Sequence, residues 1–170
     1  MVNLQYYILE FERNGKLIKS LFEEVTGDLV FWKQSEKKWC LLEIICHLYD
    51  EEREDFRTRL KSVLENPEKS FPSIDPQGWV KERKYIEQDF ENMLEKFLKE
   101  RNDSILFLQN LEEPKWNNTY IHPKLGPMSA KMILSNWLAH DYLHLKQIIK
   151  LKFDYLQLIS GESLTYAGNW

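Results

Sequence analysis

The chain has few residues that break helices: glycine and proline occur only six times each in 170 residues. Such scarcity favours long uninterrupted helices over a fold with many turns. Long hydrophobic runs are also missing, because no stretch approaches the roughly 20 apolar residues that span a bilayer. The N-terminus lacks the basic region, apolar run and small-residue cleavage site of a secretory signal. We therefore expect neither a membrane span nor a membrane partner.

Basic residues are in deficit, with 23 Lys and Arg against 27 Asp and Glu and a net charge of −4. A dedicated nucleic-acid binder is normally basic, so we expect no nucleic-acid partner. The two cysteines, Cys40 and Cys46, lie six positions apart in one predicted helix, where their sulfurs cannot meet in a disulfide. Reduced thiols favour a cytoplasmic location.

Hydrophobic residues make up 43% of the chain and aromatic residues 14%, which excludes a disordered protein. At this length we expect one domain that covers residues 1–170. Apolar residues recur every three or four positions in four segments, which predicts four amphipathic helices. These helices cover about residues 3–24, 39–64, 129–153, and a segment that begins between 77 and 84 and ends near 111.

Local signals mark the helix boundaries. Gly27 is expected to end the first helix, Asn66-Pro67 the second, and Ser129 caps the start of the fourth. A proline-marked linker over residues 71–78 follows the second helix. Residues 116–127 are expected to be irregular or loosely extended, with no strand required. The pattern predicts an all-α fold, a four-helix bundle with a long connection between helices two and three.

Acidic side chains cluster at residues 50–55 of the second helix. A run of charges usually faces water, so most of these carboxylates are expected to be solvated. Glu51 is the exception, because it lies four positions after His47 and therefore on the same side of a helix.

Three of the four histidines occupy helical positions: His47 in the second helix, and His140 and His144 four residues apart in the fourth. At 100° per residue from Trp137, His140 falls at about −60° and His144 at about −20°, both within the apolar stripe. The pair therefore points into the bundle. His47 lies on the shoulder of its stripe rather than at the centre.

Such histidines can be core residues that only satisfy hydrogen bonds. Two of them on one apolar face would repel each other if charged, and each would need a polar partner if neutral. A divalent metal answers both demands, and a third imidazole from a facing helix completes a three-nitrogen site with an open position. The remaining histidine, His122, is expected to be a loop residue rather than a fourth ligand.

Other catalytic patterns find little support. The sequence H-D-x-x-H at residues 140–144 differs from the H-E-x-x-H of metalloproteases, since Asp141 is shorter than glutamate and falls at about +40°, away from His140. No Gly-x-Ser-x-Gly and no glycine-rich phosphate loop occurs.

Two segments carry a family resemblance. Residues 39–52, WCLLEIICHLYDEE, resemble the W-(S/T)-x-x-E-x-x-x-H-L-x-D-x-E stretch of the DinB/YfiT-like superfamily. Residues 126–129, GPMS, and 140–148, HDYLHLKQI, are similar to its second motif, G-x-(L/M)-(T/S) followed by H-D-x-H-H-x-x-Q-I. Cys40 replaces the usual Ser or Thr, which removes a helix cap but no ligand. Leu143 stands where many relatives have an additional histidine that is not a ligand.

The resemblance implies a four-helix bundle of the DinB/YfiT-like type in which His47, His140 and His144 bind a divalent metal ion, commonly zinc, nickel or iron. Glu51, Asp141 and Gln147 are candidates for hydrogen bonds that hold the imidazoles in place. Relatives of this type often form homodimers, so a homodimer is expected.

The resemblance also implies chemistry. Members of the superfamily include transferases that use low-molecular-weight thiols, and others that were named metal-dependent hydrolases. The resulting hypothesis is a metal-dependent thiol S-transferase or hydrolase that acts on a small electrophilic substrate. The competing hypothesis is a non-catalytic metal-binding or stress-associated helical bundle.

Overall fold

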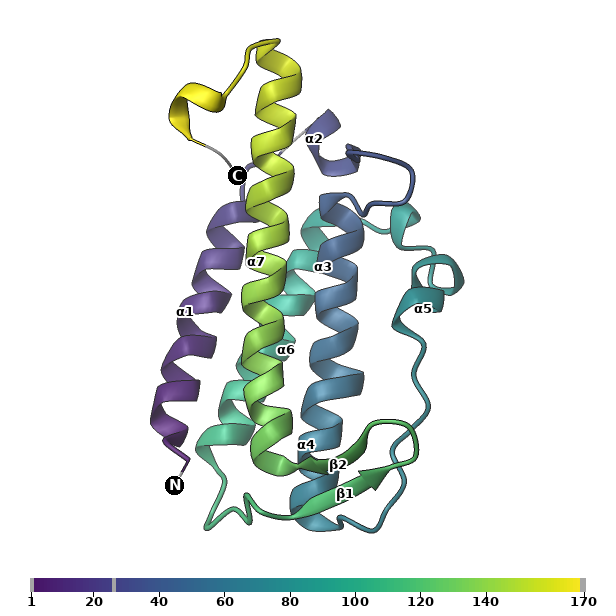
Figure 1. The fold of residues 1–170 in the computed structure, drawn as a ribbon, viewed down its shortest axis with the longest axis vertical. Coiled ribbons are helices and arrows are strands. Elements are labelled where there is room, and N and C mark those ends of the chain that lie inside the picture. Colours follow the sequence, from purple (N-terminus) through teal and green to yellow (C-terminus); the bar gives the residue numbers. More distant parts are fainter. Residues whose placement is uncertain (1, 26, 169–170) are drawn as a thin grey trace.

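The computed structural model describes residues 2–25 and 27–168, and its main feature is a bundle of four long helical segments (Figure 1). The first is α1 (Leu4–Phe22). The second is a continuous run of α3 (Leu41–Asp50), a π-helix η1 (Glu51–Phe56) and α4 (Arg57–Glu65). The third and fourth are α6 (Phe90–Gln109) and α7 (Ala130–Ser160). The predicted four-helix bundle is confirmed.

Short elements lie between the long helices and after the last of them. They are α2 (Asp28–Phe31), α5 (Pro76–Glu82), the 3₁₀ turns η2 (Tyr85–Glu87) and η3 (Thr165–Ala167), and the strands β1 (Thr119–His122) and β2 (Gly126–Ser129). The long connection between the second and third segments holds α5 and η2, and runs along the flank of the bundle (Figure 1).

Three predicted helix boundaries differ from the structure; the fourth helix, predicted to end near residue 153, continues to Ser160 in α7. Helix α1 stops at Phe22 rather than near Gly27, because Glu24 adopts a left-handed backbone with φ of 59°. The predicted helix from 77–84 to 111 is two helices, since Lys84 is also left-handed and Asp89 then starts α6 by accepting a hydrogen bond from the backbone of Asn92. Ser129 caps α7 as predicted, through Met132 N.

The segment before α7, predicted to be irregular or loosely extended, forms an antiparallel hairpin. Thr119 pairs with Ser129 and His122 with Gly126. At the turn, the Nδ1 atom of His122 accepts hydrogen bonds from the backbone of Lys124 and Leu125, each at 3.1 Å. His122 thus ends β1 and supports the hairpin turn. The hairpin lies at the end of the bundle where α7 begins (Figure 1).

The interior has two apolar clusters, one toward each end of the bundle. The first includes Ile44, Phe97 and Ile148, and the second includes Phe11 and Trp137. Between the clusters, each long segment contributes buried or half-buried polar side chains. We call this set the polar layer; it consists of Asn14, His47, Glu52, Arg101, His140, Asp141 and His144.

Among the described residues, no helix is long and apolar enough to cross a membrane.

Candidate metal centre

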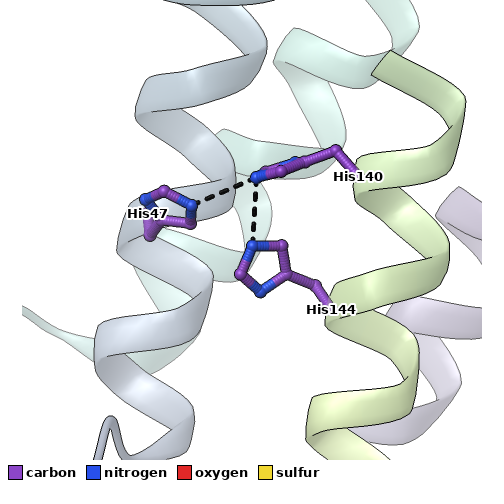
Figure 2. Close-up of side chains that lie close together, drawn as sticks. All are labelled: His47, His140 and His144. Atoms are coloured by element: carbon purple, nitrogen blue, oxygen red, sulfur yellow. Dashed lines mark hydrogen bonds between the residues drawn. The ribbon is translucent and has the colours of Figure 1, made fainter. Parts of the chain in front are cut away.

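The three histidines predicted from the sequence meet in the polar layer. His47 extends from α3, and His140 and His144 extend toward it from successive turns of α7 (Figure 2). The Nε2 atom of His140 lies 3.2 Å from Nε2 of His47 and 3.0 Å from Nε2 of His144. All three ligand atoms lie within 4.8 Å of one another. Residues almost a hundred positions apart therefore form one nitrogen cluster.

The histidine cluster is largely shielded from water. His47 and His144 are buried, with 5% and 8% of their surface exposed, and His140 is half-buried. The ring of Trp39 lies 4.7 Å from that of His47, and the ring of Phe56 lies 5.0 Å from that of His140. His47, placed by helical phase on a shoulder, is thus as well covered as the pair on α7.

Burial keeps all three imidazoles neutral. It lowers the pKa of His47 to about 3, with a smaller contribution from the charge of His144. Burial likewise lowers the pKa of His140 to about 2, helped by the other two histidines and Arg101. The pKa of His144 falls to about 4 for the same main reason. Neutral imidazole is the form that binds a metal.

The donor geometry fits a metal better than mutual hydrogen bonding. A neutral imidazole has one N–H and one lone pair, so the central Nε2 atom of His140 cannot form good hydrogen bonds to both neighbours at once. Nitrogen ligands at about 2.0–2.1 Å from a tetrahedral ion lie about 3.3–3.4 Å apart. Two of the observed separations, 3.2 and 3.0 Å, are close to that spacing, and the third pair, His47 and His144, lies within 4.8 Å, so that binding would draw these two rings together. A single cation could therefore take all three lone pairs.

Gln147 fixes the tautomer of one imidazole. Its Oε1 atom lies 2.8 Å from Nδ1 of His144, one turn along α7. An amide oxygen only accepts, so Nδ1 carries the proton and the lone pair is on Nε2, the atom that faces His140. The structure thus gives Gln147 the contact expected from the sequence.

The other two candidates lie elsewhere. Asp141 does not hydrogen-bond to an imidazole among the described residues; its oxygens accept from Arg101 at 2.6 and 2.7 Å and from Asn14 at 3.1 Å. Its position at +40° on the helix explains this, because it faces α1 and α6 instead of α3. Glu51 also makes no bond to His47, whose buried Nδ1 has no partner among the described residues.

Arg101 is the centre of the polar layer. Its guanidinium forms two hydrogen bonds to Glu52, both 2.8 Å, besides those to Asp141. Trp137 donates to the same Glu52 carboxylate at 2.9 Å. The two carboxylates raise the pKa of Arg101 against the opposing effect of burial. This network joins α6 to η1 and, through Asp141, to the helix that carries two of the histidines.

The prediction that the acidic cluster is mostly solvated is wrong. Asp50, Glu51 and Glu52 are buried, with at most 4% of their surface exposed. Arginines from outside the cluster compensate the negative charge of the carboxylates. Arg101 forms an ion pair with Glu52, and Arg83 lies 2.8 Å from Asp50. These partners come from the third segment and the long connection, so helical periodicity alone could not reveal them.

Glu51 pairs with another acid rather than with a base. Burial, and then the neighbouring Asp55 carboxyl, raise the pKa of Glu51 to about 8. Asp55 is in turn 2.6 Å from Nε of Arg59. Glu51, the first residue of the π-helix η1, is therefore largely protonated near neutral pH.

The roles of three residues of the site were not predicted from the sequence. Arg101 sits in an apolar stripe of α6, and a lone arginine there was the available signal for a buried carboxylate partner. Trp39 is the first residue of the first family motif, which marked it without explaining its contact with His47. Phe56 lies on the apolar stripe of the second helix, but its contact with His140 had no signal, because the π-helix changes the direction in which it points.

Comparison with known proteins identifies the family and the fold. A family profile described as the DinB superfamily matches residues 10–148. Among solved structures, the chain is similar to YfiT from Bacillus subtilis, described as "a probable metal-dependent hydrolase with an unusual four-helix bundle topology". The match has a TM-score of 0.79 and 16% identity, and covers 96% of this chain and 91% of the other. At that identity the likeness shows the fold alone. A search of curated proteins gave no match.

Proposed function

The chain belongs to the DinB superfamily, and we propose that it is a metal-dependent enzyme that transfers a nucleophile, water or a low-molecular-weight thiol, to a small electrophilic substrate. The observation that carries the proposal is the convergence of three neutral Nε2 atoms in the polar layer, where they are largely shielded from water. The description of YfiT as a probable metal-dependent hydrolase supports the same chemistry.

The donor set favours particular metals. Three imidazoles suit zinc, nickel or iron, whereas magnesium and calcium prefer oxygen ligands. Three protein ligands also leave a coordination position for a water or substrate, as in catalytic zinc sites. A cation held here would lower the pKa of a water or thiol that it binds and so supply the nucleophile.

The protein's own residues would orient and shield that nucleophile. Gln147 keeps the lone pair of His144 directed at the centre. Trp39 and Phe56 cover the rings of His47 and His140, and the low-dielectric surroundings strengthen charge interactions there. In either reaction the nucleophile attacks the electrophilic carbon, and the leaving group departs with the bonding electrons.

The test begins with metal content. The purified chain, loaded in turn with zinc, nickel and iron, is expected to hold one ion, and His140→Ala and His144→Ala are expected to lose it. His122→Ala serves as the control, since His122 lies in the hairpin turn. Unchanged stoichiometric binding in both α7 variants would contradict the proposed site.

Activity is then measured with each loaded form, as hydrolysis of activated esters and as conjugation of a thiol to a model electrophile. The proposal is supported if the metal-loaded wild type turns over a substrate and His140→Ala, which is expected to lose the metal, does not. One bound ion without turnover for any metal or nucleophile would instead favour the non-catalytic metal-binding protein.

A further inference from the structure

A cavity of about 280 Å³ lies against the histidine cluster on the side of the hairpin. Its wall is built from four elements that meet there: η1 with Phe56, α4 with Arg59, the hairpin with Leu125 and Met128, and α7 with Met132 and His140. Of the three histidines, His140 lines this cavity. The cavity therefore adjoins the candidate metal centre through one of its proposed ligands.

The cavity is apolar and carries no unbalanced charge. Its charged wall residues are Asp55 and Arg59, and these form an ion pair of 2.6 Å with each other. Asn136 also contributes to the wall, but its amide donates to the backbone oxygen of Met132 at 2.9 Å. A charged ligand group would find no free opposite charge here, whereas an uncharged apolar group would lose little on leaving water.

From this position and chemistry, we propose that the cavity is the subsite for an uncharged apolar substituent of the substrate. The proposal rests on the proposed function, because it places the reacting carbon at the histidine cluster and the substituent beyond His140. An apolar cavity of about 150 Å³ can hold benzene. The volume here is about 280 Å³, so an aromatic ring with a short linker or a branched alkyl group fits.

The hairpin makes this subsite adjustable. Leu125 is 64% exposed at the turn, whereas Met128 is 8% exposed and belongs to the second apolar cluster. The inner wall, at Met128, is thus packed in the hydrophobic core. The outer wall, at Leu125, belongs to the two-stranded hairpin outside the four helices. Changes at the outer wall are expected to alter substrate choice without disturbing the bundle.

The test uses cobalt as a spectroscopic ion and two thiols that differ by one ring, ethanethiol and 2-phenylethanethiol. Each thiolate can bind the ion, and only the second places a phenyl group in the cavity. Binding is followed by the visible absorption of the cobalt-loaded full chain, so no turnover is needed. The wild type is expected to bind 2-phenylethanethiol at least tenfold more tightly than ethanethiol.

Met132→Trp fills the cavity and is expected to reduce that preference to about twofold or less, with unchanged affinity for ethanethiol. Leu156→Trp is the matched control, since it places the same side chain at another exposed apolar position of α7, and it should keep the tenfold preference. Leu125→Asp places a charge at the outer wall and should also lower the preference, should Met132→Trp fold poorly.

The outcomes separate the two proposals. Absence of cobalt binding would overturn the proposed function, and the subsite with it. Three results would overturn the subsite alone, provided that cobalt binds. They are equal affinities for the two thiols, no affinity for either thiol, and a preference for 2-phenylethanethiol that survives both Met132→Trp and Leu125→Asp.

Discussion

At the scale of single residues, the contact between Gln147 and His144 orients a proposed ligand. Gln147→Leu removes the acceptor of the Nδ1 proton and frees the imidazole to change tautomer. Loss of such a supporting bond typically lowers metal affinity about 10–100-fold. We expect a decrease of that size, measured by competition with a chelator. Gln147→Glu keeps an acceptor and should retain most of the affinity.

The matched control for this prediction is Gln157→Leu, because Gln157 is an exposed residue of the same helix. Equal affinities of Gln147→Leu and Gln157→Leu would show that the amide contact does not support metal binding.

A second single residue, Glu51, should make the metal-free protein less stable in alkaline solution. Its pKa is raised to about 8 by burial and by Asp55, from an ordinary value of 4.5. The folded form therefore keeps a proton that the unfolded form has lost, and the stability that this carboxyl contributes is full below pH 4.5 and lost as the pH rises through about 8. Glu51→Gln carries no titrating group and should abolish this loss.

The measurement is urea unfolding with a chelator present, at about pH 5 and about pH 8.5, where the difference attributable to Glu51 should be on the order of 1–3 kcal/mol. Glu65→Gln, at an exposed position of α4, should leave the pH dependence of the wild type unchanged. A pH dependence that is identical in Glu51→Gln and the wild type would contradict the raised pKa.

At the scale of elements, the Arg101 network connects α6 with η1 and α7. Arg101→Leu leaves Glu52 and Asp141 buried without their cation, and breaking a buried pair in this way costs about 3–5 kcal/mol. We expect a decrease of that size in the free energy of unfolding, measured by denaturant titration. Lys99→Ala, which removes an exposed pair with Asp103 on the same helix, should cause no measurable change.

The four helices and the inward direction of the α7 histidines could be predicted because both follow from local periodicity. His140 and His144 share a face with Trp137, and that pattern continues along α7 as far as Leu151. The contact of His47 with this pair depends on tertiary packing of α3 against α7, which local periodicity does not show. Its phase on α3 indicated only a shoulder position, and the family resemblance supplied the association.

The parts that could not be predicted break the local rules. The wider turn of the π-helix Glu51–Phe56 displaces its later residues, and those that follow, from a 100° period. This displacement turns Phe56 toward His140. The hairpin contains Pro127 in β2 and only four residues in each strand, so its strand signal is weak. Both irregular elements line the cavity beside the histidine cluster, where local regularity matters less than the shape of the site.

At the scale of the whole molecule, the proposed ligands link the second and fourth segments, so metal binding should stabilise the bundle. A ligand that binds only the folded form at a hundred times its dissociation constant adds about 2.7 kcal/mol. For a domain of this size the thermal midpoint should rise by about 5–10 °C. Zinc should produce this rise in the wild type and in His122→Ala, but not in His140→Ala. Magnesium, which prefers oxygen ligands, should have no effect on any of them. A zinc-dependent rise that persists in His140→Ala would place the stabilising ion somewhere other than between α3 and α7.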